Sequence, residues 1–132
     1  MKFITKDMDY AIRAVIAIAS SNKKILNVKD ILSKTLIPRP FLRKIMQKLS
    51  QKGLVKTIKG RNGGFSLVKQ DVSIYDIIRS FSKKITLNDH LFRGEKCPFY
   101  ATCNVKVELD KIDDEIIRRF KNVSIQKIID KK

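Results

Sequence analysis

The fold is decided by residues 53–69, Gly53-Leu-Val-Lys-Thr-Ile-Lys-Gly-Arg-Asn-Gly-Gly-Phe-Ser-Leu-Val-Lys69. Two short runs typical of β-strands, Leu54–Ile58 and Phe65–Val68, flank a turn of glycine, arginine and asparagine. Asn and Gly supply the positive φ angles that a tight hairpin needs, so we expect an antiparallel hairpin here. The hairpin is also basic, with cations at Lys56, Lys59, Arg61 and Lys69.

The residues before this hairpin predict two short helices. Thr5 can cap a first helix that runs to about Ala19. Asn27 starts a second helix, with Asp30 placed to complete a capping box. Residues 35–37 then form a turn. The apolar residues that recur at helical spacing and should face the core are Met8, Ala11, Ile12, Val15, Ile18, Ala19, Val28, Ile31 and Leu32.

A third helix leads directly into the hairpin. Pro38 and Pro40 open it, because proline is tolerated only in the first turn of a helix. Gly53 ends it. Its expected buried stripe is Leu42, Ile45, Met46 and Leu49, and its opposite face holds Arg43, Lys44, Gln47, Lys48 and Gln51. A basic amphipathic helix followed by a small basic hairpin is the pattern of a winged helix-turn-helix, in which the hairpin is the wing.

The charge is distributed unevenly along the 132 residues, whose formal net charge is +16. Residues 1–70 hold 16 Lys and Arg against 3 acids, a net charge of +13, whereas residues 71–132 hold 13 against 10, a net charge of +3. This asymmetry indicates an N-terminal module that binds a polyanion. The alternative, a lysine-rich chain with solvated surfaces, does not predict the asymmetry.

We therefore expect the third helix and the wing to contact double-stranded DNA. The N-terminal end of the second helix of a helix-turn-helix enters the major groove, where Arg pairs with guanine and an apolar side chain contacts the thymine methyl. Wing cations suit a narrow minor groove, and Lys56 and Lys69 suit phosphates. An ordinary solvated helix, and a packing role for Phe41, are the alternatives. The expected contact residues are Arg39, Pro40, Phe41, Arg43, Lys44, Lys48, Lys59, Arg61, Asn62 and Gly63.

The C-terminal half predicts a different role. Ser73 and Asp76 cap a fourth helix, residues 82–103 are less regular, a long helix spans residues 104–121, and Ser124 caps a short last helix. We divide the chain into a DNA-binding domain (1–81), an effector loop (82–103) and a dimerisation region (104–132). Pairing of the long helix with that of a second copy would bury its apolar stripe; docking on its own domain is the alternative. The stripe is Val105, Leu109, Ile112, Ile116 and Phe120.

Several classes of protein fit poorly. No run reaches the roughly 18 apolar residues of a membrane helix and no signal peptide is evident, so we expect a cytoplasmic protein without membrane contact. A thiol enzyme is disfavoured because Cys97 and Cys103 form no Cys-x-x-Cys pair and the chain has one histidine. An RNA-binding or ribosome-associated protein is the alternative partner class, although the aromatic stacking positions of RNA-binding sheets are missing.

The chain resembles the Rrf-type bacterial transcriptional regulators, which include IscR, NsrR and CymR. The resemblance implies a homodimeric transcription factor with a long dimerisation helix. It places Pro40, Phe41 and Arg43 at base-reading positions and Lys59 where a minor-groove arginine is common. Leu36 departs from the small residue usual in the turn, which should only alter packing. The motifs that carry the resemblance are Asp9-Tyr10-Ala11-Ile12-Arg13, Pro40-Phe41-Leu42, Lys52-Gly53-Leu54-Val55, Lys59-Gly60-Arg61-Asn62-Gly63-Gly64-Phe65, and Cys97-Pro98 with Cys103.

The cysteines match this family only in part. Its iron–sulfur members hold a cluster with three cysteines, and Cys97 and Cys103 match the second and third, but Leu91 stands at the first and Lys106 replaces a later histidine. The resemblance implies that Cys97, Cys103, His90 and Asp9 of the other subunit could hold a [2Fe–2S] cluster. The alternatives are a thiol pair that oxidises or binds a small effector, as in a cluster-free regulator, and two inert cysteines.

Together these observations predict a mainly α protein with a small β-hairpin, a winged helix-turn-helix followed by a long dimerisation helix. The expected function is sequence-specific regulation of transcription as a repressor, by a homodimer on a two-fold symmetric operator. The signal, which is redox, iron–sulfur or nitric-oxide status or a small metabolite, would enter through residues 90–103.

Overall fold

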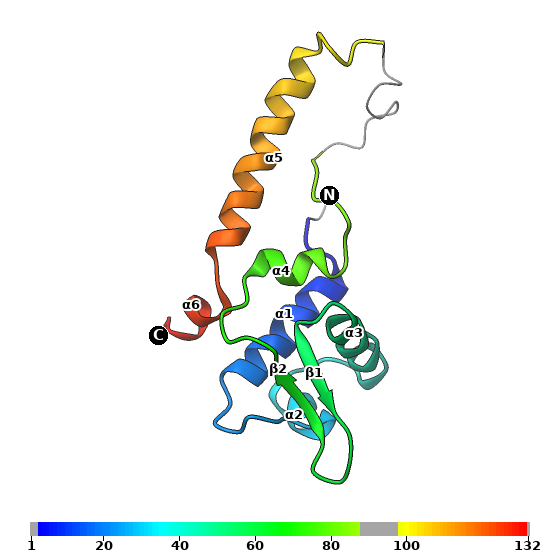
Figure 1. Cartoon of the computed structure of the whole chain (residues 1–132), viewed down its shortest axis with the longest axis vertical. Helices are drawn as coiled ribbons and strands as arrows, with labels where there is room; N and C mark the ends of the chain where they lie inside the picture. The colour runs from blue at the N-terminus through cyan, green and yellow to red at the C-terminus, as the bar shows by residue number, and fades with distance from the viewer. Residues whose placement is uncertain (1–2, 88–97, 132) are drawn as a thin grey trace.

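Six helices and a two-stranded hairpin make up the part of the chain that the structure, a computed structural model, describes, namely residues 3–87 and 98–131. Figure 1 shows α1 to α4, the hairpin and α6 gathered in one body, from which α5 projects. The mainly α fold with a small hairpin is confirmed. The elements are α1 (Lys6–Ala19), α2 (Val28–Lys34), α3 (Arg39–Gln51), β1 (Val55–Ile58), β2 (Gly64–Leu67), α4 (Ile74–Arg79), α5 (Asn104–Asn122) and α6 (Ile125–Ile129).

The helices begin at the positions that the capping residues predicted for them. The Met8 N–H donates to Thr5 Oγ1 at 3.2 Å at the start of α1. Asn27 and Asp30 form a reciprocal capping box, with N···O distances of 2.8 and 3.1 Å. Ser73 repeats this arrangement before α4, and Ser124 accepts from the Lys127 N–H before α6. Each such cap contributes on the order of 1 kcal/mol, because it bonds an otherwise unpaired N–H.

The core lies between α1, α3 and the strands. The predicted stripe of α3 is buried completely, since Leu42, Ile45, Met46 and Leu49 are all at most 1% exposed. Burying each such side chain contributes about 1.5–3 kcal/mol. On α1 the predicted apolar face is joined by Ala14 and Ala17, which are also buried. The turn is different: Leu36 is 100% exposed. Our expectation that Leu36 alters packing is therefore wrong, because its side chain has no neighbour to pack on.

The hairpin is antiparallel, with Val55 opposite Leu67 and Ile58 opposite Gly64. Strand β1 begins one residue after the expected start at Leu54. Strand β2 begins and ends one residue before the expected limits at Phe65 and Val68. Our prediction that Asn62 adopts a positive φ is wrong, because glycines alone have positive φ among the described residues. Gly64 meets two demands: its φ is +154°, and a Cβ there would lie 2.3 Å from the carbonyl oxygen of Leu26.

This close approach reflects a third stretch of backbone beside the hairpin. The Leu26 N–H donates to the Phe65 carbonyl at 2.9 Å, and the Phe65 N–H donates to the Leu26 carbonyl at 2.7 Å. Strand β2 of the wing is thus bonded to the segment that precedes α2, so the wing and the helix-turn-helix are held as one unit.

The chain returns to this body along α5, whose C-terminal end leads directly into α6 (Figure 1). Ile125 of α6 is fully buried in the core. The Ile74 N–H donates to the Val123 carbonyl at 2.8 Å, and the Ile125 N–H donates to the Val72 carbonyl at 2.7 Å. The last helix therefore packs with the DNA-binding module, which local sequence patterns did not indicate.

Candidate nucleic-acid interface

The N-terminal half of α3 presents its cations to solvent. Pro38 occupies the N-cap without a side-chain hydrogen bond, and the first turn carries no acid. The unpaired N–H groups and the partial positive charge of this end therefore favour an anion nearby. The predicted contact residues Arg39, Pro40, Arg43, Lys44 and Lys48 are all exposed.

Phe41 is only partly available for base contact. Its ring lies edge-on to that of Tyr10, with ring centroids 5.9 Å apart and an interplanar angle of 60°. Phe41 nevertheless remains 39% exposed. The structure shows the packing role, and the contact with a thymine methyl stays a prediction.

The cations of α3 lie on two flanks of its exposed face. Lys44 and Lys48 border a hollow of about 400 Å³ together with Asp7, Met8 and Phe81, on the side of the N-terminal end of α1. Arg43 lies two turns before Ser50, whose hydroxyl is 3.2 Å from that of Thr57 in β1, so Arg43 shares the flank that faces the hairpin. Gln47 and Gln51, which the predicted contact set omits, are also exposed. An amide side chain can pair with adenine in the major groove.

The tip of the wing carries the other predicted contacts. Lys59, Arg61 and Asn62 are exposed, and Gly63 is half-buried. A Cβ on Gly63 would lie 2.1 Å from the Ile58 carbonyl oxygen, so glycine is required here by space. No acid occurs between Gly53 and Lys69, so the wing tip is uniformly positive.

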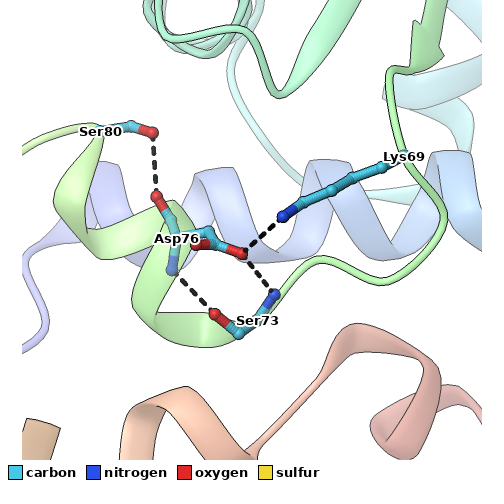
Figure 2. Close-up of polar contacts among 4 residues, drawn as sticks. All are labelled: Lys69, Ser73, Asp76 and Ser80. Carbon is cyan, nitrogen blue, oxygen red and sulfur yellow. Dashed lines mark hydrogen bonds and ion pairs between the residues drawn. The ribbon is translucent and has the colours of Figure 1, made fainter.

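The far end of the wing is tied to α4, as Figure 2 shows. Lys69 Nζ lies 3.6 Å from Asp76 Oδ2, and the same carboxylate accepts the Ser73 N–H at 3.1 Å. Ser80 Oγ donates to the Asp76 backbone carbonyl at 3.1 Å. Lys69, which we expected to contact phosphate, therefore already has an anionic partner within the protein.

The predicted metal ligands are only partly described. Cys97 and His90 lie outside the described residues. Cys103 is the N-cap of α5, where its Sγ accepts the Lys106 N–H at 3.4 Å. Asp9 Oδ2 accepts from Arg13 Nε at 3.0 Å. Within residues 3–87 and 98–131, no group of three His, Cys, Asp or Glu side chains could hold a metal ion.

Lys106, which the resemblance puts at the position of a histidine ligand, has partners within the chain. Its Nζ donates to Asp110 Oδ2 at 2.6 Å and lies 4.8 Å from the centroid of the Tyr100 ring. The hydrogen bond to Asp110 raises the pKa of Lys106 above its usual value, which favours the charged form of this side chain.

The predicted dimerisation stripe is partly exposed in the single chain. No residue of α5 is buried, and Val105 and Ile112 are 65% and 43% exposed. Leu109, Ile116 and Phe120 are half-buried. The helix thus keeps an apolar face that its own domain does not cover.

Comparison with known proteins shows which family this chain belongs to. The family described as "Rrf2: Iron-dependent Transcriptional regulator" matches residues 4–131. The chain belongs to the Rrf2 family. It is 32% identical over 131 residues to NsrR, an HTH-type transcriptional regulator of Bacillus licheniformis, covering 96% of this chain and 91% of that protein. Rrf2 proteins are transcriptional regulators and not enzymes, so DNA-binding regulation is the activity of this chain as well.

Solved structures of Rrf2 proteins share the fold. CymR, the global cysteine regulator of B. subtilis, superposes with a TM-score of 0.76 at 20% identity, covering 98% of this chain and 97% of that one. T. potens IscR gives a TM-score of 0.73 at 19% identity, covering 98% and 86%. Among the described residues, no helix is long and apolar enough to cross a membrane.

Proposed function

We propose that this Rrf2 protein acts as a homodimeric repressor that reads a two-fold symmetric operator. The observation that supports this most directly is that exposed Arg43 lies on the flank of α3 that faces the hairpin, and that the wing carries Lys59 and Arg61 but no acid. Arg43 on the hairpin flank would read base edges, and Lys59 with Arg61 would enter the adjacent minor groove. Lys59 offers a point charge without the planar fork of arginine, so the wing would respond mainly to groove width.

The exposed stripe of α5 supports the dimer. Two copies of α5 packed antiparallel around a two-fold axis would each bury Leu109, Ile112 and Ile116. The two recognition helices would then face half-sites that are separated by about one turn of DNA or a multiple of it. This arrangement would give the apolar stripe of the projecting amphipathic helix a surface to pack on.

The operator can be found by selecting bound duplexes from a random pool and measuring band shifts with the selected sequence. We expect an inverted repeat, bound more tightly than a scrambled duplex and than structured RNA of equal charge. Tighter binding to the RNA, or selection of a single unrepeated half-site, would contradict the proposal. Because phosphate contacts dominate affinity, all arms are compared at one salt concentration.

The sensing chemistry follows one of two routes in this proposal. The first is a [2Fe–2S] cluster held by Cys97, Cys103, His90 and Asp9 of a second copy, which would supply a one-electron redox change. The partly exposed Cys103 thiol at a helix start suits this role, and the family description as iron-dependent supports it. The second route is oxidation or ligand binding by the two thiols, without a cluster. A cytoplasmic location accompanies either route.

Anaerobic purification separates the two routes. A cluster predicts brown protein with equal amounts of iron and acid-labile sulfide, and Cys103→Ala should abolish both. Colourless protein after enzymatic cluster assembly, together with a change in operator affinity on mild thiol oxidation, would favour the thiol pair. If neither iron loading nor oxidation changes operator affinity, both sensing routes are contradicted. The DNA-binding part of the proposal would still stand.

A further inference from the structure

A hollow of about 410 Å³ lies where α4, the segment after it and α5 meet. It is separate from the exposed face of α3 and from the wing tip. Its position at the junction between the DNA-binding body and the projecting helix is one where ligand sites commonly occur, and its volume is within the usual range for small molecules. The lining residues are Tyr75, Arg79, Lys83, Lys84, Ile85, Asp110, Asp113, Asp114 and Ile117.

The lining carries opposite charges on opposite sides. Arg79, Lys83 and Lys84 come from α4 and the segment after it, whereas the aspartates all come from α5. Among the described residues, no ion pair within 4.0 Å joins Arg79, Lys83 or Lys84 to Asp113 or Asp114. A molecule that carries both charges could therefore contact both sides at once.

The shape of the hollow is fixed by the chain itself. Asp113 accepts hydrogen bonds from Thr86 Oγ1 at 3.0 Å and from the Leu87 N–H at 2.8 Å, which holds the segment after α4 against α5. Arg79 Nη1 donates to the Ser82 carbonyl at 2.8 Å. These bonds hold the backbone around the hollow in place, so a ligand would have to order only the exposed side chains of Lys83, Lys84 and Asp114.

Two of the three aspartates are already engaged. Asp113 holds the segment after α4, and Asp110 accepts from Lys106. The Asp114 carboxylate makes no hydrogen bond or ion pair within the described part of the chain, and neither do the ammonium groups of Lys83 and Lys84, although the Lys84 carbonyl accepts from Ser82 Oγ at 2.8 Å. One carboxylate and two ammonium groups thus remain for a ligand, beside the apolar surfaces of Ile85, Ile117 and the Tyr75 ring.

We propose that this hollow binds an α-amino acid with a small apolar side chain, as an effector of the regulator. The carboxylate of the ligand would lie at Lys83 and Lys84, its ammonium group at Asp114, and its side chain against Ile85 and Ile117. A divalent cation fits less well, because no metal-holding group exists among the described residues and three cations line the site. A simple anion fits less well because it would face the aspartates.

This effector role rests on the proposed function. A ligand that joins Lys84 to Asp114 changes the contact between α4 and α5, and therefore the orientation of the body relative to the dimerisation helix. Any resulting change in operator affinity must be matched by an equal change in ligand affinity on the operator-bound protein.

Calorimetry on the full chain without DNA tests the site directly. The probes are L-valine, 2-hydroxyisovalerate, which lacks the ammonium group, and isobutylamine, which lacks the carboxylate. We expect saturable binding of L-valine, and binding at least about tenfold weaker for the other two. Asp114→Asn and Lys84→Gln should each weaken the binding of L-valine by a similar factor. Glu115→Gln, next to Asp114 but outside the hollow, is the matched control and should change nothing.

The results separate this inference from the proposed function. Absence of saturable L-valine binding up to about 10 mM, or binding that Asp114→Asn and Lys84→Gln leave unchanged, overturns the site. Binding with no change in operator affinity overturns the effector role, while the DNA-binding proposal stands. A band shift at the selected operator without amino acid shows independently that the regulator is intact. Circular dichroism of the variants verifies that each has folded.

Discussion

The body formed by α1 to α4, the hairpin and α6 differs from α5 in how its apolar residues are used. In the body, the stripe of α3 is entirely buried, and even the terminal α6 contributes the fully buried Ile125. In α5, a stripe with similar spacing buries no residue. Helical periodicity is thus the same in both regions, while the surroundings differ. The difference teaches that equal spacing does not imply equal burial: one stripe is covered within the chain, and the other is left partly open.

The largest effect should follow from placing charge on the unsatisfied stripe. Leu109→Asp with Ile116→Asp would bury unpaired carboxylates in the proposed interface, at a cost of several kcal/mol. We expect a monomer by sedimentation velocity with normal helix content. Lys111→Asp with Arg118→Asp, two new carboxylates away from the stripe, should remain dimeric. A dimer that survives the first pair of substitutions would place the interface elsewhere.

The second prediction compares one residue from each stripe. Leu42→Ala should lower the free energy of unfolding by about 2–5 kcal/mol, because a cavity remains in a packed core. In the monomeric background, Val105→Ala should change it by less than about 0.5 kcal/mol, since Val105 is exposed there. Urea unfolding measures both. Similar losses at the two positions would mean that α5 packs against its own domain in solution.

The third prediction concerns the outside of the body rather than its core. Arg43→Ala should leave stability unchanged but cost about 1–3 kcal/mol on the selected operator, with relaxed base preference at one position. Lys48 lies on the other flank of α3, so Lys48→Ala should weaken binding to the selected operator and to random duplexes equally. If Arg43→Ala also weakens both equally, Arg43 contacts phosphate only.

The smallest effect is expected at the base of the wing. Lys69 is 58% exposed, so Lys69→Ala should cost about 0–1 kcal/mol through loss of its ion pair with Asp76. Asp76→Ala should cost more, about 0.5–2 kcal/mol, because it also removes the capping box of α4. Thermal unfolding at low and high salt distinguishes them, since screening should reduce only the ion-pair contribution.

Local signals in the sequence were sufficient for much of the fold. Thr5, Asn27, Ser73 and Ser124 marked the helix starts because capping is an interaction within four residues. The α3 stripe and the site of the wing followed from periodicity and turn residues in the same way. Asn62 was the exception, since among the described residues only glycines adopt the positive φ angles that we expected of the turn.

Contacts between distant segments could not be predicted in this way. The bond between Leu26 and Phe65, the edge-on contact of Tyr10 with Phe41, and the burial of Ile125 each join residues far apart in the chain. Periodicity identifies an apolar face but does not say what covers it. For the same reason the sequence placed Lys69 on DNA, whereas the fold brings it to Asp76.

The two backbone bonds that join Val72 and Ile74 to the residues around α6 have a mechanical consequence. They attach the C-terminal end of α5 to the body, so we expect α5 to move as a stiff lever rather than as a loosely tethered arm. A helix of 19 residues is about 28 Å long, and a tilt of about 10° at its base displaces its far end by roughly 5 Å. In a symmetric pair of such levers, a change of one hydrogen bond near the fulcrum would be magnified into a different distance between the two recognition helices.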